Sequence, residues 1–182
     1  MIDPETSLLL GRLVLGRTVA SLATLHDGRP FASMIPYAVL VTGHDPAGEA
    51  SRDGRNDAGS VVFVSHVSRL SAHTRDMLAT PEVCLLVTAP EAAESSGTPP
   101  QALPRVSLPA QATFIDRAHP AHDALARVYL SRFPSAADWF QLGDFSIVVF
   151  EPTSARFVAG FGRALTLSPA QFHAAVAAAA AG

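Results

Sequence analysis

The chain has 182 residues, of which 48% are hydrophobic and 16% are charged, and this composition is typical of a globular protein with an apolar core. Its 13 basic and 16 acidic residues give a net charge of −3 without any Lys/Arg-rich run, which argues against a nucleic-acid-binding protein. No apolar stretch reaches the ~18–20 residues of a membrane-spanning helix, and acidic residues occupy the N-terminus where a signal peptide would be positive, so a cytoplasmic protein is expected.

The first elements of the chain follow periodicity and turn signals. Residues 4–16 are expected to form a short amphipathic helix. Two apolar runs then flank an Asp-Gly dipeptide, which is typical of a tight turn and predicts a β-hairpin with strands at 18–25 and 31–41. Pro36 lacks the N–H that a strand ladder uses, so it marks a bulge or an edge position.

The middle of the chain is expected to alternate strands with one helix and two loops. Apolar residues at helical spacing predict a helix over 68–79. The polar segments 43–59 and 90–104 are expected to be loops that are partly mobile or shape a substrate entrance. Strands are expected at 60–65, 82–89 and 105–116, and the last of these alternates apolar and polar residues.

The last third is expected to hold a helix, a helical turn, two strands and a helical tail. The helix is indicated by an apolar stripe of Ala121, Ala124, Leu125, Val128 and Tyr129. Strands follow at 144–152 and 155–162, and the tail 168–182 begins with Ser168 as N-cap and Pro169 at the first helical position, but its alanines offer little to pack. Short strands with few helices predict a single mainly β (α+β) domain over 1–182, an antiparallel β-barrel with flanking helices.

Cys84 is the only cysteine, and it lies in the apolar run VCLLV. A single cysteine cannot form a disulfide within the chain, so its side chain is expected to be a small buried hydrophobe. A chain with one cysteine and no disulfide of its own fits a reducing compartment.

The stretch VFVSHVSRLSAHTRDML combines features of an anion-binding site. If the helix begins at Ser68, Arg69 adds a cation where free backbone N–H groups already make the helix end positive. Further hydrogen-bond donors around the same turn are the Ser65, Ser68 and Ser71 hydroxyls and His66. Their convergence predicts a phosphate pocket. In the alternative interpretation, Ser68 only caps the helix and Arg69 points into solvent.

His73 and Thr74 fall on the inward stripe of the same expected helix, beside Leu70 and Met77. An apolar residue is the default at such positions, and a buried polar side chain needs a hydrogen-bond partner. The two residues therefore either make hydrogen bonds within the core or face a polar cavity beneath the anion site.

Three segments carry a resemblance to a known family: ASLATLHDGRPFASMIPYAV, VFVSHVSRLSAHTRDMLATPEVCLLV and PRVSLPAQATFID. Together they resemble the FMN-binding split-barrel family related to pyridoxamine 5'-phosphate oxidase. The chain is more similar to the haem-utilisation (HugZ-like) branch, which has a similar S-x-L-x-x-H-T helix start, a YL…FP helix end, a DF strand and a final GFGRA. The resemblance covers about residues 15–167.

The resemblance implies a homodimer of split barrels that holds two FMN molecules at the subunit interface. The family's phosphate-binding segment matches SHVSRL, which ends at Leu70, and the resemblance implies Ser65, His66 and Arg69 as the phosphate contacts. His73 and Thr74 match the motif that follows the phosphate turn. The backbone that lies along the flavin ring in the family matches Ser33, Met34, Ile35 and Pro36. Arg105 matches a position that often contributes a polar contact from the partner subunit.

Three departures from the family pattern bear on the cofactor. Leu70 stands where the oxidases tend to have Lys, which removes one phosphate contact. Asp76 stands where the haem branch commonly has Asn, and its charge would oppose a phosphate if it faced inward. Larger haem-utilisation members carry a C-terminal extension for haem handling, whereas this chain ends in an Ala-rich tail. His173 in that tail is expected to face solvent or pack against a partner rather than bind iron.

Two further motifs, the pair His119 and His122 and the segment AGFGRA, do not indicate a metal site or a dinucleotide-binding site. His119 and His122 stand three apart, but no carboxylate or Cys completes a metal site. The glycines of AGFGRA are expected to mark a bulge or a tight packing contact.

The expected function is an FMN-dependent oxidoreductase acting on a small molecule, in which no side chain need be a catalytic acid or base. Alternatives are a HugZ-type haem-binding or haem-degrading protein and a non-catalytic flavin-binding domain, with haem or the deazaflavin F420 in place of FMN.

Overall fold

A computed structural model describes residues 2–43, 59–90 and 99–182. Its strands are β1 (Val19–His26), β2 (Arg29–Pro36), β3 (Ala38–Val41), β4 (Val61–Ser68), β5 (Glu82–Thr88), β6 (Arg105–Ile115), β7 (Phe145–Pro152), β8 (Ala155–Gly160) and β9 (Arg163–Leu167). Its helices are α1 (Pro4–Gly16), α2 (Ala72–Ala79), α3 (His122–Arg132) and α4 (Pro169–Ala181), with the 3-10 segments η1 (Pro100–Ala102) and η2 (Pro134–Gln141). Most of the expected loop at 43–59 and residues 91–98 of the expected loop at 90–104 lie outside the described residues, and η1 lies in the described part of the second loop.

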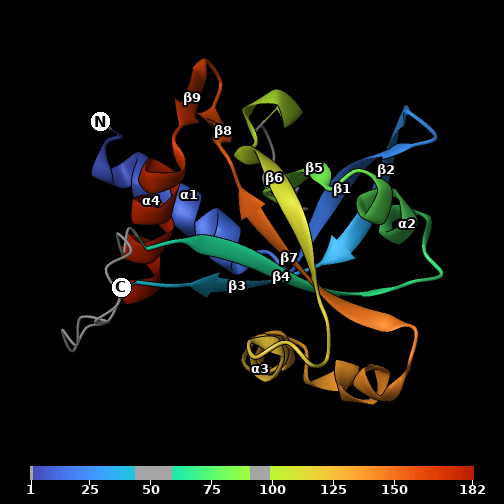
Figure 1. Cartoon of the computed structure of the whole chain (residues 1–182). Helices are drawn as coiled ribbons and strands as arrows, with labels where there is room; N and C mark the ends of the chain where they lie inside the picture. The colour runs from blue at the N-terminus through green and yellow to red at the C-terminus, as the bar shows by residue number, and fades with distance from the viewer. Residues whose placement is uncertain (1, 44–58, 91–98) are drawn as a thin grey trace.

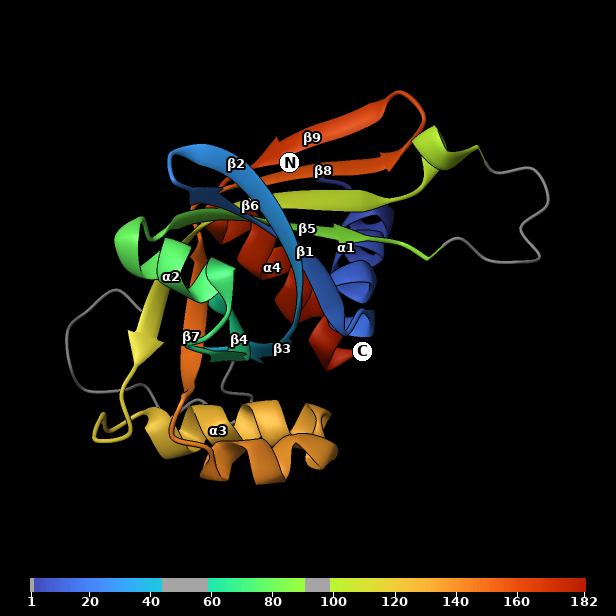
Figure 2. The same ribbon diagram turned by 90° about the vertical axis from the view of Figure 1, so that its right-hand side faces the viewer.

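The strands form one antiparallel sheet in the order β2-β1-β5-β6-β7-β4-β3, with β8 and β9 extending from β6 (Figure 1). Helices α1 and α4 pack against each other at one end of the sheet, whereas α3 lies apart from them beside β4 and β7 (Figure 2). No helix among the described residues is both long enough and apolar enough to cross a membrane.

The predicted hairpin is present as β1 and β2, paired from Val19 with Pro36 to His26 with Arg29. At its turn Asp27 has φ 50° and Gly28 has φ 73°. Two consecutive positive φ angles match the right-handed twist of paired strands, and this is why an Asp-Gly pair predicts such a turn. The hairpin prediction is therefore confirmed.

The expected strand over 31–41 is two strands in the structure. β2 ends at Pro36 and pairs with β1, whereas β3 begins at Ala38 and pairs with β4. These consecutive strands thus occupy opposite ends of the sheet order, which requires the sheet to curl until its two edges meet. The hydroxyl of Ser65 on β4 donates a hydrogen bond of 2.7 Å to the Pro36 carbonyl at this junction. Pro36 is tolerated because it ends an edge strand, as expected.

The expected helix start at Ser68 is wrong. β4 continues through Ser68, which pairs with Phe145 of β7, and α2 begins only at Ala72. Arg69 therefore lies in a turn between strand and helix, with its backbone N–H donating to the Asp144 carbonyl at 2.7 Å. Ladder pairing with β7, which a local pattern cannot reveal, determines this boundary.

The C-terminal segment differs from expectation in two ways. The tail has the predicted Ser168 cap, which forms a capping box with Gln171, but α4 packs tightly on α1 rather than having little to pack. Phe172 and Val176 of α4 are buried in the main core. The additional strand β9 was not expected, and it is joined to β8 through Gly162 at φ 74°. The predicted bulge is confirmed by a register shift at Gly160.

Gly11 sets the distance between α1 and α4, and replacing it by alanine tests that packing. A Cβ at position 11 would overlap the Ala179 side chain and lie 2.7 Å from the Ala175 carbonyl oxygen. Gly11→Ala is expected to lower the free energy of unfolding by about 1–3 kcal/mol, the typical cost of overpacking. Urea denaturation measures it. Gly16→Ala is the matched control in the same helix, because a Cβ there meets no atom within 4 Å. Equal stability of the two variants would contradict this packing.

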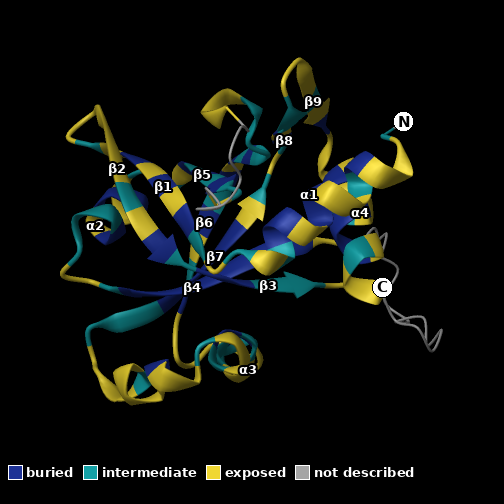
Figure 3. Cartoon of the chain, turned by 180° about the vertical axis from the view of Figure 1, so that it is seen from behind, coloured by how far each residue is buried: buried dark blue, intermediate teal, exposed yellow. Residues whose placement is uncertain are grey.

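β4 is buried along most of its length (Figure 3). Its buried side chains belong to two separate cores. Phe63 and Val67 point into the main barrel core, whereas Val62 and Val64 point toward α3. Since alternate residues of a strand point to opposite faces, Ser65 and His66 also diverge. Cys84 on β5 is partly exposed on the outer face rather than buried as expected, although burial still raises the pKa of its thiol.

Candidate functional site

Arg69 lies at the junction of β4, β7 and the turn before α2. Its Nε–H donates to the Ser146 hydroxyl at 3.3 Å, and its side chain is exposed. The Ser68 hydroxyl donates to Asp144 Oδ2 at 2.7 Å and accepts from the Leu70 N–H at 3.1 Å. The Ser68 side chain is therefore occupied by its own chain, and it is no free donor for an anion.

A cavity of about 240 Å³ opens beside Arg69, on the α3 side of β4. Its polar lining residues are His66, Arg69, Asp116, Arg117, His122 and Ser146. Positive and neutral donors outnumber the single carboxylate in this lining, so the cavity favours an anion. Arg117 donates to the carbonyls of Phe140 at 2.8 Å and Leu142 at 3.0 Å, which fixes the end of η2 against the cavity.

His66 is the buried polar member of this cavity, with only 6% of its surface exposed. Its ring stacks on Phe140 with centroids 3.9 Å apart and planes 5° from parallel. Among the described residues, no hydrogen-bond partner meets its Nδ1. Burial, aided by repulsion from His122 and Arg117, lowers the pKa of His66 to about 4. The imidazole is therefore neutral near pH 7 and can offer one donor and one acceptor.

The predicted convergence of hydroxyls around Arg69 is wrong for most of its members. Ser65 points into the barrel, where it bonds Pro36, whereas His66 points toward α3. Ser71 is the N-cap of α2 but makes no side-chain capping bond. Only His66 and Arg69 of the predicted phosphate group share a cavity, because strand alternation separates neighbours on β4.

The SMIP segment presents alternating side chains at the end of β2. Met34 is 62% exposed, whereas Ile35 is buried at 1%. The Ser33 hydroxyl is buried without a hydrogen-bond partner among the described residues. Leu70, in the turn before α2, is 76% exposed. Met34 and Leu70 are therefore two large apolar side chains that this chain leaves uncovered.

Two of the remaining predicted residues, Thr74 and Arg105, make hydrogen bonds within their own chain. Thr74 is fully buried and donates to the Ser68 carbonyl at 2.7 Å, which supports the core interpretation of this residue. Burial lowers the pKa of His73. Arg105, on β6, donates to the carbonyls of Gln101 at 3.0 Å and Leu103 at 3.1 Å, far along the sheet from Arg69.

Sequence reasoning missed a hydrogen-bonded group that joins α2 to β1. The Asp76 carboxylate is 5% exposed, and it accepts from Thr24 Oγ1 at 2.8 Å and from His26 Nδ1 at 2.8 Å. Burial alone would raise the pKa of Asp76, but these hydrogen bonds outweigh it and lower the pKa. The hydrogen bond to Asp76 raises the pKa of His26. Asp76 thus faces inward but toward β1, where its charge is paired with His26. The sequence signal that could have indicated this group is Asp76 itself, which stands where the haem branch commonly has Asn.

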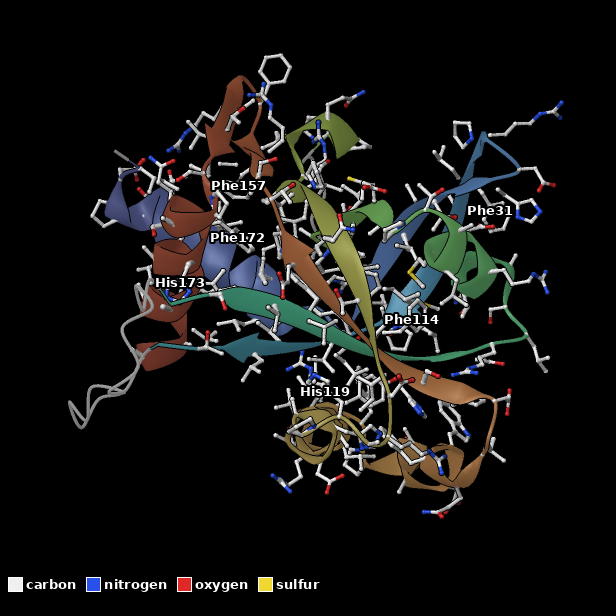
Figure 4. All side chains as sticks on the ribbon, in the orientation of Figure 1. Phe31, Phe114, His119, Phe157, Phe172 and His173 are labelled. Carbon is white, nitrogen blue, oxygen red and sulfur yellow. The ribbon has the colours of Figure 1, made fainter. Side chains whose placement is uncertain are left out.

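The histidines considered as ligands from the sequence have other surroundings. His173 lies on α4 (Figure 4), and a Cβ at Gly59 would overlap its imidazole, so His173 packs within its own chain instead of facing solvent or a partner. His119 Nδ1 accepts a hydrogen bond of 3.1 Å from the Ala121 N–H. Within the described residues, no three His, Cys, Asp or Glu side chains are grouped to hold a metal ion.

Comparison with known proteins gives two similar proteins whose names refer to heme and one whose description refers to the pyridoxinephosphate oxidase family. The chain is 34% identical over 140 residues to the Arabidopsis thaliana protein named non-canonical heme oxygenase HOZ, chloroplastic, a match covering 76% of this chain and 35% of that protein. The solved structure of a heme binding protein from Mycobacterium smegmatis has a TM-score of 0.73 at 24% identity, covering 96% of this chain and 62% of that one. This chain therefore spans less than two thirds of each of these proteins.

A third similar structure comes from Clostridium acetobutylicum and is described as related to general stress protein 26, of the pyridoxinephosphate oxidase family. Its TM-score is 0.58 at 13% identity, covering 94% of this chain and 99% of that one. The two structures confirm the expected fold, an antiparallel split barrel with flanking helices. The family described as CREG, beta-barrel, matches residues 11–174. Since this match covers most of the chain, the protein belongs to the CREG β-barrel family.

Proposed function

We propose that this protein binds FMN and uses it as an oxidoreductase on a small molecule. The observation that carries the proposal is the cavity beside Arg69, where a guanidinium, the Ser146 hydroxyl and the neutral His66 imidazole meet. An exposed guanidinium and a hydroxyl suit a phosphate, and the unpartnered Nδ1 of His66 gives this buried lining unused hydrogen-bonding capacity.

The size of the cavity bears on how FMN would lie. Pockets for whole ligands usually measure about 300–1,000 Å³. The cavity of about 240 Å³ is therefore suited to the phosphate end, with the flavin ring outside it. Met34 lies in the SMIP segment and Leu70 in the SHVSRL segment, the two segments that resemble the family's flavin site. Both side chains are exposed and offer apolar surface for such a ring. A ring in that place needs a second surface to exclude water.

A second copy of the chain is the proposed cover. On the outer face of the sheet, Ala23 of β1 pairs with Ala32 of β2 and with Cys84 of β5, and Ser21 pairs with Met34 and Leu86. These side chains are small or apolar and point away from the barrel core, as in a surface suited to a homodimer interface. In such a dimer Arg105 would reach the cofactor of the partner subunit. A cytoplasmic location stays a prediction.

FMN supplies hydride or electron transfer at its N5 atom when it is bound. The roles left to this chain are to bind the phosphate through Arg69 and Ser146, to orient the ring along the Ser33–Pro36 backbone, and to keep water out. The catalytic competence of such a site depends on position and electrostatics, so no acid or base side chain is assigned.

The test is the absorption spectrum of the purified protein, followed by mass analysis of what is released on denaturation. A flavin spectrum and the mass of FMN are expected, together with a particle twice the mass of one chain. Reduction of the bound flavin by NADH or NADPH would show the oxidoreductase activity. A bound deazaflavin of the F420 type would replace FMN in the proposal, and a protein that takes up neither cofactor would overturn it.

Haem binding is the second candidate function. The observation that favours it is the names of the relatives, one a heme oxygenase at 34% identity and one a heme binding protein with the same fold. Titration with haemin tests it through the appearance of a Soret band of bound haem. A flavin that binds but is reduced by no donor, with no haem bound, would instead indicate a non-catalytic flavin-binding domain.

A further inference from the structure

A second cavity with a positive lining lies where the end of α1, the start of β3 and the last turn of α3 meet. Its volume is about 290 Å³, and it shares no lining residue with the cavity beside Arg69. Two arginines line it, Arg17 and Arg132, and no acidic residue does so in the described part of the chain. Its walls are otherwise largely apolar, formed by Leu15, Val39 and Val128 among others. Such a lining favours an anion.

The polar groups of this cavity other than Arg17 have partners within the chain. Arg132 donates through Nη2 to the carbonyls of Leu15 at 2.9 Å and Arg17 at 3.1 Å, at the end of α1. These carbonyls belong to the negative end of the helix dipole, so the charge of Arg132 is balanced there. The Tyr37 hydroxyl donates to the Val14 carbonyl at 2.8 Å, and the Ser131 hydroxyl donates to the Val128 carbonyl at 2.8 Å.

Arg17 is the cation that lacks a partner. Its side chain is half-buried, and its Nε–H is buried without a hydrogen-bond partner among the described residues. Within the same residues, no carboxylate lies within 4.0 Å of its guanidinium. Burial raises the pKa of Tyr37, and the charges of Arg132 and Arg17 oppose this rise, so both charges act at the cavity. A buried donor without a partner calls for a bound group that accepts from the same side chain.

We propose that this cavity binds a small organic carboxylate, held by the Arg17 guanidinium, with its apolar body against Leu15, Val39 and Val128. The planar fork of a guanidinium matches the two oxygens of a carboxylate. The apolar walls favour an anion that carries a hydrocarbon part over a bare inorganic ion. A volume of about 290 Å³ admits only a small molecule, since pockets for whole ligands measure about 300–1,000 Å³. The site is separate from the proposed FMN site and does not depend on it.

Titration of the full chain with benzoate, followed by amide chemical shifts in NMR spectra, tests the proposal. Benzoate is expected to shift the amides of Arg17, Val39 and Val128 in a saturable way, which gives its dissociation constant. Benzamide has nearly the same shape without the charge, and it is expected to bind wild type at least about tenfold more weakly. Arg17→Gln is expected to weaken benzoate binding by about 10- to 100-fold and to leave benzamide binding unchanged, because only the charge-assisted bonds are lost.

The control variant is Arg12→Gln, which removes an exposed guanidinium of α1 that does not line the cavity. It is expected to bind benzoate within about twofold of wild type. Arg17→Lys, with folding checked by circular dichroism, serves if Arg17→Gln does not fold, and the loss of the planar fork is expected to weaken benzoate binding. Wild-type affinity in a folded Arg17 variant would overturn the proposal. So would benzoate that shifts none of these amides, or inorganic phosphate that shifts them while benzoate does not.

Discussion

Replacing Arg69 by alanine is expected to weaken FMN binding by roughly 10- to 100-fold. A hydrogen bond between a cation and a phosphate contributes about 1.5–3 kcal/mol, and about 1.4 kcal/mol corresponds to a tenfold change in affinity. Arg69 makes one bond of 3.3 Å to Ser146 and none within this chain to a carboxylate among the described residues, so its charge is available to a ligand. Quenching of FMN fluorescence on titration gives the dissociation constants.

The control for this prediction is a second exposed arginine nearby. Arg75→Ala on α2 removes a guanidinium that donates only a long bond of 3.4 Å to the Leu70 carbonyl, and it is expected to leave FMN affinity within about twofold of wild type. Riboflavin, which lacks the phosphate, is expected to bind Arg69→Ala and wild type equally. If Arg69→Ala retained wild-type FMN affinity, the cavity beside β7 would not be the phosphate site.

Replacing His66 by phenylalanine is expected to remove a large part of the acid sensitivity of the fold. The folded state holds His66 neutral because burial lowers its pKa from 6.5 to about 4, whereas the unfolded chain takes up a proton below pH 6.5. Stability is therefore lost as the pH falls through this interval, since the unfolded state binds more protons. Over the interval the loss reaches roughly 3 kcal/mol, at about 1.36 kcal/mol per pH unit.

Urea denaturation of wild type and His66→Phe at pH 7 and pH 4.5 measures the difference. Phenylalanine keeps the aromatic stack on Phe140 and cannot be protonated, so the stability gap between the two proteins is expected to change in favour of the variant on acidification. His119→Phe is the control, because His119 is exposed. The same pH dependence in wild type and His66→Phe would show that the imidazole is not held neutral.

Some elements follow from nearby residues alone. The Asp-Gly pair required two positive φ angles, and Asp27 and Gly28 have them because few residues other than glycine and short polar ones adopt that conformation. The alternation in β6 predicted its buried face, with Val106, Leu108 and Ala110 inside. Ser168 began α4 as expected, since a capping bond joins residues only three apart.

The candidate site was predicted only in part. Arg69 and His66 share a cavity as the sequence suggested, but α2, whose dipole was expected to add to the charge of Arg69, begins only at Ala72, beyond the turn. Ser68 was lost as a donor because Asp144, distant in the chain, accepts its hydrogen bond. The resemblance to the split-barrel family pointed to this segment, but it could not give the direction of each side chain.

Neighbouring residues were enough to predict the hairpin turn, the alternating strands and the helix cap. The end of β4, the faces on which Ser65 and His66 lie and the contact between Asp76 of α2 and His26 of β1 became evident from the folded chain alone. The two groups of features differ in how far apart in the sequence the interacting residues stand. Turns, caps and alternation depend on steric and hydrogen-bonding limits within a few residues, whereas ladder pairing and buried charge pairs join residues that no short pattern connects.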